Sequence, residues 1–331
     1  MSAMSPWRLS VAPMLEWSDK HGRYLHRLIT KKTRLYTEMV TTGGLLHGGE
    51  RRHLRYDEVE HPLALQLGGS EPADLARCAQ IGARWGYDEI NLNCGCPSER
   101  VQRGAFGACL MAEPQLVADG VKAMVDAVDV PVTVKHRIGI DKEESYAFVR
   151  DFVGTVADAG CRVFIVHARN AWLKGLSPKE NREIPPLRYE RVYQLKRDFP
   201  HLTIVLNGGV TTDEQIAEHL RHVDGVMLGR EAYHHPWMMS GWDARFLGGA
   251  PNPITPDEVE AAMVAYMQRE LVEDGTPWSA IARHMLGLHH GRRGARLWRQ
   301  VWSDHKLKPL PAAEVAALAR AHLASAAMAV A

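Results

Sequence analysis

The sequence predicts an α/β fold in which a (β/α)8 TIM barrel is followed by a smaller all-helical C-terminal domain. Eight short apolar runs alternate with segments of helical periodicity over roughly 240 residues, which is the size of such a barrel. No strand pattern appears beyond residue 255. A doubly wound sheet is the competing arrangement, but it normally carries a glycine-rich phosphate turn after its first strand, and the first run here ends in Ala12-Pro13-Met14.

The apolar runs predict eight strands, at residues 9–14, 35–40, 62–67, 89–95, 132–138, 162–168, 203–209 and 225–231. The periodic segments predict helices between them, at residues 19–31, 71–84, 113–128, 143–159, 188–199 and 213–221. The predicted domains are the barrel at 1–247, a Gly- and Pro-rich linker at 248–255 and a helical domain at 256–331. Thr255 as N-cap, Pro256 and Glu258 predict a capping box at the start of that domain.

The composition of the 331 residues excludes several classes of protein. The net charge of +1 gives no global argument for a polyanionic partner. Among five cysteines only Cys94 and Cys96 lie close together, which supports neither a disulfide framework nor a zinc site, so we expect no metal. There is no signal-peptide pattern and no uncharged apolar stretch long enough to span a membrane, so we expect a cytoplasmic protein.

The stretch at residues 89–111 carries the strongest indication of a reactive site. Asn91 and Asn93 share one face of the predicted strand, because side chains repeat every two residues. The strand cannot continue through Gly95-Cys96-Pro97, so Cys96 is expected in a loop, where a thiol can meet a substrate. The other four cysteines are expected elsewhere. Cys78 and Cys161 lie in a helix-like and a helix-end stretch, Cys94 on the opposite strand face and Cys109 in the core.

Two glycine turns follow the predicted seventh and eighth strands, which is where barrels of this kind hold phosphate. They are Asn207-Gly208-Gly209 and Gly229-Arg230. Glycine allows backbone N–H groups to approach a phosphate, and Arg230 can add a charged donor. Either motif alone is better explained as a simple turn, but the occurrence of both at this pair of strands favours phosphate binding.

Basic residues end the predicted fifth and sixth strands. Lys135 and Arg137 share a face of one, and His167 and Arg169 share a face of the other. A single residue of this kind is usually a solvated rim residue, whereas four that converge with Gln66 on one mouth predict a site for an anion or an anionic cofactor state.

The strand-end motifs occur together in one order along the chain. They are Ala12-Pro13-Met14, Thr37-Glu38-Met39-Val40, Gln66-Leu67-Gly68-Gly69, Asn91-Leu92-Asn93, Gly95-Cys96-Pro97, Val134-Lys135 with Arg137, His167-Ala168-Arg169, Asn207-Gly208-Gly209 and Gly229-Arg230. Together they resemble the flavin-dependent tRNA-dihydrouridine synthases across essentially the whole barrel. Residues 175–186 further resemble the branch that modifies positions 20 and 20a of the tRNA D-loop. The chain departs from that pattern at Cys94, where an apolar residue is usual.

The resemblance implies a bound FMN that NADPH reduces and that passes a hydride to C6 of a uridine, while Cys96 donates a proton to C5. An ordinary thiol has a pKa of about 8.5, so it is mostly protonated at neutral pH and can act as an acid. The implied cofactor contacts are Ala12, Pro13, Met14, Gln66, Lys135, His167, Asn207, Gly208, Gly209, Gly229 and Arg230. Asn93 and Arg137, with Arg169, are implied to orient the uracil.

A base inside folded tRNA must leave its stack to reach a barrel mouth, so RNA-binding surfaces are expected nearby. The long connection at residues 170–187 contributes Lys179, Asn181 and Arg182, with a solvated loop as the alternative. Residues 283–308 hold seven Lys and Arg against one acid. There Arg296 and Arg299 lie on one helix face and Trp298 and Trp302 on the other, which predicts phosphate contact by the arginines and packing by the tryptophans.

Three other readings compete with tRNA reduction. A flavin oxidoreductase acting on a free dihydropyrimidine or dihydroorotate shares the barrel and Lys135, but gives no role to the basic helical region. A tRNA-binding protein whose barrel no longer catalyses would be colourless and bind no FMN. A phosphate-binding barrel without flavin leaves the motif around Cys96 unexplained. Because one chain supplies both the barrel and the basic region, we expect a monomer.

Overall fold

The computed structural model describes residues 4–328, without the side chains of Arg100, Arg103 and residues 326–328. Contacts divide the chain into two compact units. The first comprises the described residues of Met1–Ser18 and Arg34–Gly229, and the second those of Asp19–Thr33 and Arg230–Ala331. Helix α1 (Lys20–Ile29) therefore belongs to the unit that holds the C-terminal helices. The predicted domain limits at residues 247 and 256 stay a prediction.

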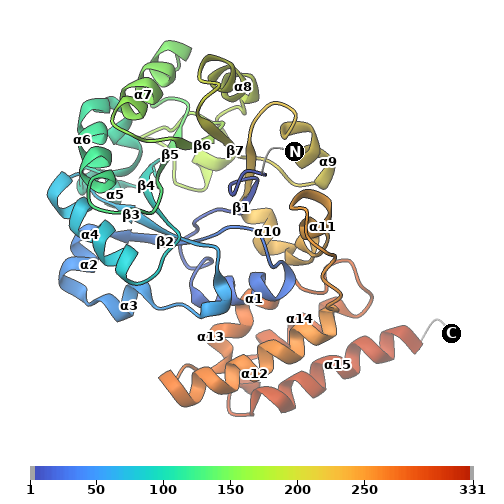
Figure 1. Cartoon of the computed structure of the whole chain (residues 1–331). Coiled ribbons are helices and arrows are strands. Elements are labelled where there is room, and N and C mark those ends of the chain that lie inside the picture. Colours follow the sequence, from blue (N-terminus) through green and yellow to red (C-terminus); the bar gives the residue numbers. More distant parts are fainter. Residues whose placement is uncertain (1–3, 329–331) are drawn as a thin grey trace. The chain divides into compact units, whose positions relative to one another are not determined.

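The first unit is built on eight parallel strands, in the spatial order β1-β8-β7-β6-β5-β4-β3-β2 (Figure 1). They are β1 (Leu9–Val11), β2 (Leu35–Thr41), β3 (Leu63–Gly68), β4 (Glu89–Cys94), β5 (Val132–Arg137), β6 (Val163–His167), β7 (Thr203–Asn207) and β8 (Gly225–Leu228). A parallel bridge between Ser10 and Arg34 brings β1 to the start of β2. The predicted eight-stranded barrel is confirmed.

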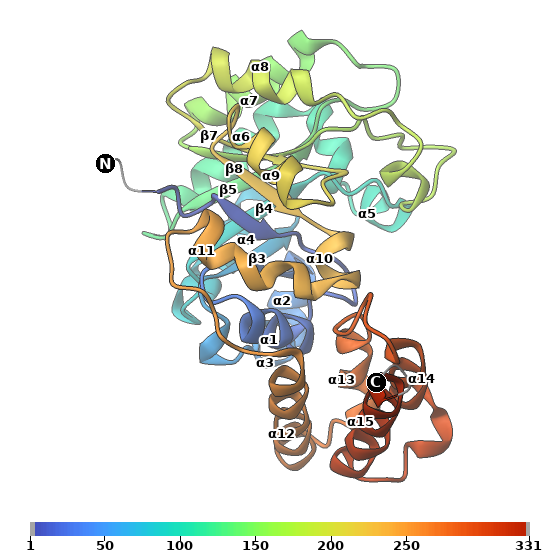
Figure 2. The ribbon, with the colours of Figure 1, turned by 90° about the vertical axis from the view of Figure 1, so that its right-hand side faces the viewer.

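Helices surround these strands, as Figure 2 shows for α4, α6, α7 and α8. The helices of this unit are α2 (Thr42–Gly48), α3 (Glu50–Leu54), α4 (Pro72–Arg84), α5 (Glu99–Arg103), α6 (Pro114–Val125), α7 (Tyr146–Asp158), α8 (Tyr189–Asp198) and α9 (Asp213–His219). Short 3-10 turns add η1 (Glu58–Glu60), η2 (Gly107–Ala112) and η3 (Glu180–Arg182). Helix α4 buries Leu75, Cys78, Ala79 and Gly82, the spacing of one helical face.

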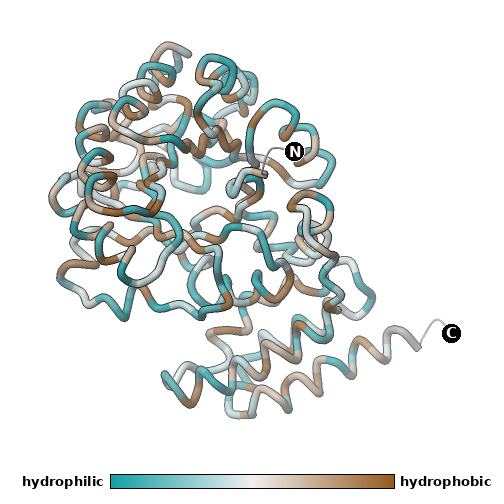
Figure 3. The backbone as a smooth tube through the Cα atoms, in the orientation of Figure 1, coloured by the Kyte–Doolittle hydropathy of each residue, from teal (hydrophilic) through white to brown (hydrophobic). Residues whose placement is uncertain are grey.

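Apolar residues recur along the strands in the backbone trace (Figure 3). Inside the barrel, Tyr36, Ile165, Val205 and Met227 belong to one buried cluster against which Met14 packs. Because parallel strands with helices on their outer face are buried on both sides, near-continuous apolar runs are what this architecture needs. Polar side chains inside the barrel therefore need partners of their own.

The second unit is all-helical within the residues that are described. Its helices are α1, α10 (Arg230–His234), α11 (Trp242–Phe246), α12 (Pro256–Asp274), α13 (Trp278–Ala282), α14 (Ala295–Ser303) and α15 (Ala312–Met328), with the 3-10 turns η4 (Pro236–Gly241), η5 (Arg283–Met285) and η6 (His305–Leu307). The predicted capping box is present: Thr255 Oγ1 accepts from the N–H of Glu258, whose carboxylate accepts from the N–H of Thr255. None of the described helices is long and apolar enough to cross a membrane.

The structure differs from the prediction at element ends. Strand β1 stops at Val11, so residues 12–14 form a loop rather than a strand end. Helices α2 and α3 were not predicted, because they are short and lie in a segment that lacks clear periodicity; the Thr41 side chain caps α2, whereas α3 has no side-chain cap. Helix α15 lies at the end of the segment predicted to be helical, and the last three residues of that segment lie outside the described part.

Candidate active site

The register of the parallel strands aligns the predicted site residues in rows. Gln66 lies opposite Asn91, Asn93 opposite Lys135, and Arg137 opposite His167. His167 in turn lies opposite Asn207. Since the carboxyl ends of parallel strands meet at one end of a barrel, the structure brings these residues together at the mouth.

Cys96 lies in the loop after β4, as predicted, and its side chain is half-buried. The Asn93 side chain holds this loop, because its Oδ1 accepts from the N–H groups of Gly95 and Cys96, each at 3.0 Å. The thiol of Cys96 donates to Ser98 Oγ at 3.6 Å. A thiol that is oriented in this way at a barrel mouth is placed where it can act as an acid.

The remaining thiols are placed differently. Cys78, Cys94 and Cys161 are buried, and burial raises the pKa of each, that of Cys161 to about 12. Cys109 is half-buried in η2, where its Sγ donates to the carbonyl of Phe106 at 3.1 Å. The three buried thiols stay protonated and enclosed, which leaves Cys96 in its loop and Cys109 in η2 as the two half-buried thiols.

The side chain of Lys135 ends beside Asn207, where its Nζ donates to Oδ1 at 3.1 Å. Asn207 is itself held by a bond from Nδ2 to the carbonyl of Met227 at 2.8 Å. Burial, together with the charges of Arg137 and Arg182, lowers the pKa of Lys135 to about 7, with Cys96 acting in the opposite direction. An anionic ligand beside this amine would restore its charged form.

The positive charge extends to β6. Burial, followed by the charges of Arg137 and Lys135, holds the pKa of His167 well below its ordinary value. Burial also lowers the pKa of Arg137 to about 10. Because like charges are gathered in a desolvated place, the mouth favours an anion over a cation.

The first predicted phosphate turn has the backbone that such a role needs. Gly208 and Gly209 have φ of 115° and 72°, a conformation that favours glycine. A Cβ on Gly208 would lie 2.7 Å from Cδ2 of His167, so only glycine fits beside this ring. The hydroxyl of Tyr189 donates to the carbonyl of Gly208 at 2.9 Å and fixes the turn.

The second turn lies beside the loop that follows β1. A Cβ on Gly229 would contact both Ala12 Cβ and Met14 Sδ at 3.7 Å. The N–H of Ala12 donates to the carbonyl of Leu228, and the N–H of Met14 donates to Ser18 Oγ. Arg230 is the next residue and opens α10, which belongs to the second unit. With Pro13 between Ala12 and Met14, the first unit thus gathers most of the predicted cofactor residues.

Arg137 is 3% exposed and donates to three backbone carbonyls. Its Nε bonds Gly95, and its Nη1 bonds Asn170 at 3.2 Å and Asn181 at 2.9 Å. Arg169 likewise donates to the carbonyls of Glu183 and Pro185. These two arginines therefore tie the connection at residues 170–187 to the barrel mouth, a task that sequence reasoning did not predict.

The connection at residues 170–187 is held together by hydrogen bonds within the loop. Asn181 is fully buried, with Oδ1 accepting from the N–H of Trp172 and Nδ2 donating to the carbonyls of Trp172 and Leu176. The Asn181 amide therefore bonds to backbone groups of its own loop. Lys179 and Arg182 are exposed.

Two polar residues of this region were missed by sequence reasoning. Gln102 Nε2 donates both to the carbonyl of Pro97 and to that of Leu173, each at 2.7 Å, and so links the Cys96 loop to residues 170–187. Ser98 accepts from the thiol. The signal for Ser98 was its place two residues after Cys96, whereas nothing in the sequence marks Gln102.

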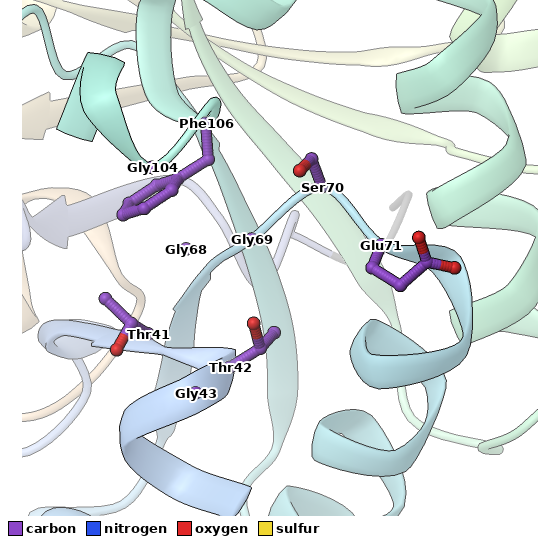
Figure 4. Close-up of a pocket in the computed structure, with 9 residues that line it drawn as sticks. All are labelled: Thr41, Thr42, Gly43, Gly68, Gly69, Ser70, Glu71, Gly104 and Phe106. Atoms are coloured by element: carbon purple, nitrogen blue, oxygen red, sulfur yellow. The ribbon is translucent and has the colours of Figure 1, made fainter.

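A pocket of about 330 Å³ opens beside the ends of β2 and β3 (Figure 4). It is lined by residues 41–43, residues 68–71, Gly104 and Phe106. The ring of Phe106 faces the two threonines across the pocket in Figure 4. Its walls combine glycine backbone, hydroxyl groups and the ring of Phe106, so it offers a ligand polar and apolar surface in similar measure.

In the second unit, α14 has the two faces that were predicted. Trp298 and Trp302 are buried and both donate to Glu260 Oε1, at 2.9 and 2.8 Å. Arg296 and Arg299 are exposed on the same helix. Across the described residues, no group of three or more His, Cys, Asp or Glu side chains could hold a metal ion.

The class of protein follows from this geometry. A parallel eight-stranded barrel whose strand ends present a thiol, a desolvated amine and glycine turns is the framework of a TIM-barrel enzyme. A solved 2-naphthoyl-CoA reductase complex shares the fold, with a TM-score of 0.54 over 71% of this chain and 49% of the other at 9% identity. That likeness concerns architecture alone.

The family is shown by closer matches. The dihydrouridine synthase family model matches residues 10–323, and the chain belongs to this family. It is 57% identical to the tRNA-dihydrouridine(20/20a) synthase of Salmonella typhimurium over 97% of this chain and 96% of the other. It is 58% identical to the Escherichia coli K12 protein of the same name over 91% and 87%, and to the Vibrio parahaemolyticus one over 93% and 94%.

Proposed function

We propose that this protein reduces the C5–C6 double bond of uridine to dihydrouridine in the D-loop of tRNA, at positions 20 and 20a, using FMN and NADPH. Support comes from the names of its relatives and their coverage of nearly the whole chain. The observation that carries the proposal is the cationic mouth beside Cys96, where an amine whose pKa lies near 7 faces a thiol-bearing loop. A free dihydropyrimidine or dihydroorotate as substrate is not favoured.

The residues present fit an FMN. The glycine turn at Gly208 and Gly209 would hold its phosphate together with Gly229 and Arg230. Lys135, beside Asn207, has a charge that an anionic group would stabilise. When bound, FMN supplies hydride chemistry, taking two electrons from NADPH and returning a hydride to C6 of the uracil.

The other proposed cofactor contacts line the same mouth. Gln66 and His167 would bond the ring system, and Ala12, Pro13 and Met14 would lie along it. Gln66 is buried and joined to both asparagines of β4, so its amide is fixed before any ligand arrives. A site fixed in advance loses less entropy on binding.

Cys96 is proposed as the proton donor to C5, which balances the hydride added at C6. Its thiol is oriented toward Ser98 and its backbone is held by Asn93. Asn93, Arg137 and Arg169 are proposed to face the uracil, with the arginines also tying down residues 170–187. Their backbone bonds leave the guanidinium groups rigid, which favours orientation of a planar base.

Contacts to the rest of the tRNA are proposed for Lys179 and Arg182 and for the exposed pair on α14, Arg296 and Arg299. All four side chains are exposed, which supports the proposal. Asn181 was predicted as a further contact, but its side chain is fully buried and bonds within its own loop, so we propose that it only holds the shape of that loop. Neutralising phosphates with arginine releases counterions and so drives binding at low salt. A cytoplasmic monomer is part of the proposal.

The experiment maps dihydrouridine by mass spectrometry in tRNA from cells that lack this gene, complemented by wild type or by Cys96→Ala. Loss at positions 20 and 20a that wild type restores and the alanine variant does not would support the reaction, the positions and the acid together. An unchanged tRNA profile in a strain with no redundant synthase would overturn the proposal and favour the small-molecule reaction.

A further inference from the structure

A fully buried carboxylate, Glu89, begins β4 inside the barrel. Its Oε1 accepts from the hydroxyls of Tyr36 and Thr133, at 2.8 and 2.5 Å. Its Oε2 accepts from Trp7 Nε1 at 2.7 Å and lies 3.2 Å from Nη1 of Arg34. Three hydrogen-bond donors and the guanidinium group of Arg34 therefore surround the two carboxylate oxygens.

A chain of side-chain hydrogen bonds runs from this carboxylate to the Cys96 loop. Asn91 Nδ2 donates to Thr133 Oγ1 at 2.7 Å, and Gln66 Nε2 donates to Asn91 Oδ1 at 2.7 Å. Asn93 Nδ2 donates to Gln66 Oε1 at 2.9 Å. The chain ends where Asn93 Oδ1 accepts from the two loop N–H groups. Every donor in it points toward Glu89.

The donor-to-acceptor direction of these hydrogen bonds is set at the Glu89 end. The single hydroxyl hydrogen of Thr133 is donated to Oε1 of Glu89, so the hydroxyl oxygen can only accept from Asn91. That bond fixes which end of the Asn91 amide is the donor, and each following amide is fixed in turn. Reversal would turn the NH2 group of Asn93 toward the N–H groups of Gly95 and Cys96, donor against donor, and would release the loop.

We propose that Glu89 is a positioning residue for Cys96, which it orients from the opposite end of β4 by setting the direction of this chain through Thr133, Asn91, Gln66 and Asn93. The inference rests on the proposed function for what Cys96 does, but not for how its loop is held. The chain is composed of residues whose register is set by three neighbouring strands, so it is as rigid as the sheet.

The test compares three variants of the full-length protein. Thr133→Val keeps the shape of the side chain and removes the hydroxyl that joins Glu89 to Asn91, while Thr133→Ser keeps the hydroxyl. Tyr36→Phe is the matched control, because it removes a buried hydroxyl from the same Glu89 oxygen but leaves the chain intact. Glu89→Gln has an amide that can donate to Thr133 and so permits the reversed chain.

The first readout is amide hydrogen exchange at Gly95 and Cys96, resolved by mass spectrometry. Thr133→Val and Glu89→Gln are expected to speed exchange at these two amides about tenfold, and Thr133→Ser and Tyr36→Phe to leave it near wild type. The second readout is the rate and pH profile of Cys96 alkylation by iodoacetamide, which should change in the same two variants. In turnover, those variants should lower kcat about tenfold with KM for tRNA unchanged.

Wild-type exchange and alkylation in Thr133→Val would overturn the inference. So would equal changes in Thr133→Val and Tyr36→Phe, because the effect would then follow from lost stability rather than from chain direction. If Cys96→Ala still forms dihydrouridine while exchange behaves as expected, the proposed function of Cys96 fails and the positioning of its loop by Glu89 stands.

Discussion

The barrel mouth and helix α14 both concentrate positive charge, but they hold it in opposite ways. At the mouth, Arg137 is 3% exposed and donates hydrogen bonds to backbone carbonyls. Burial there lowers the pKa of Lys135 to about 7. On α14, Arg296 and Arg299 point into solvent from a helix whose other face buries two tryptophans. The same residue types therefore face a dry and a wet environment.

Because of this difference, we expect the barrel mouth to determine specificity for a particular anion and α14 to contribute to the affinity for tRNA. A desolvated cation interacts strongly with a single well-placed anion and is insensitive to salt. An exposed arginine adds a modest, salt-dependent attraction to any phosphate. We therefore expect substitutions at the mouth to abolish chemistry or cofactor binding, and substitutions on α14 to change only the strength and salt dependence of tRNA binding.

The largest effect is expected from Cys96→Ala. Loss of the proton donor should lower the rate of dihydrouridine formation by about 10²- to 10⁴-fold, because general acid catalysis contributes about that much. Oxidation of NADPH in the absence of tRNA should be unchanged, and single-turnover kinetics of the two half-reactions measure both. Cys109→Ala, at the other half-buried thiol, is the control and should behave as wild type. Equal loss in both half-reactions would contradict a role limited to the proton.

The next effect concerns the pH dependence of FMN binding. Lys135 must be charged to stabilise an anionic ligand, and in the free protein it loses its proton as the pH rises through about 7. Binding above that pH takes up a proton, so affinity should fall by up to about tenfold per pH unit between pH 7 and 9. Fluorescence titration of apoprotein with FMN measures this. Lys135→Met should bind more weakly with a flat profile, and a wild-type slope in that variant would count against Lys135.

A smaller effect is expected from replacing Arg296 and Arg299 together by alanine. Affinity for tRNA should weaken, and the slope of log K against log salt should flatten by about 1 to 2, because two phosphate contacts are lost. Filter binding at several salt concentrations measures both, with NADPH oxidation unchanged. Arg77→Ala with Arg221→Ala removes the same charge from exposed positions on α4 and next to α9 and serves as the control. An identical loss in the control would mean that total charge alone matters.

The smallest effect is on stability. The native pKa of Lys135 lies below the unfolded value of 10.5, so its protonation favours the unfolded chain and lowers stability fully below pH 7 and progressively less toward pH 10.5. Lys135→Met should therefore stabilise the ligand-free protein by about 1 to 2 kcal/mol, more at pH 6 than at pH 9. Thermal unfolding at the two pH values checks the sign. If Lys135→Met destabilised the protein at both pH values, burial of the charged Lys135 side chain would not be a cost to stability.

Much of the fold could be predicted because its signals are local. Eight apolar runs are required by strands that are buried on both faces, and Gly95-Cys96-Pro97 ends a strand by its own backbone chemistry. Strand alternation also predicted that Asn91 and Asn93 share a face and that Cys94 does not, and the hydrogen bonds of the two asparagines and the burial of Cys94 agree.

What could not be predicted depends on partners distant in the sequence. The sequence shows Arg137 and Arg169 as charges at strand ends, but their carbonyl partners belong to a loop whose path only tertiary contacts define. In the sequence Glu89 is only a polar residue at the start of a strand, and its three hydrogen-bond donors and its ion-pair partner come from three other segments of the protein. Helices α2 and α3 are short and lack a clear apolar period, so the pattern of apolar residues does not reveal them.

The amide of Gln102 has a consequence for how this protein can diverge. Because Nε2 bonds Pro97 and Leu173 with its two hydrogens, one side chain sets the spacing between the loop that bears the thiol and residues 170–187. A shorter residue cannot reach both carbonyls, and a single donor cannot serve both. Among descendants of this chain, insertions or deletions in residues 170–187 should therefore be inherited together with a change at position 102, so that the two loops evolve as one unit.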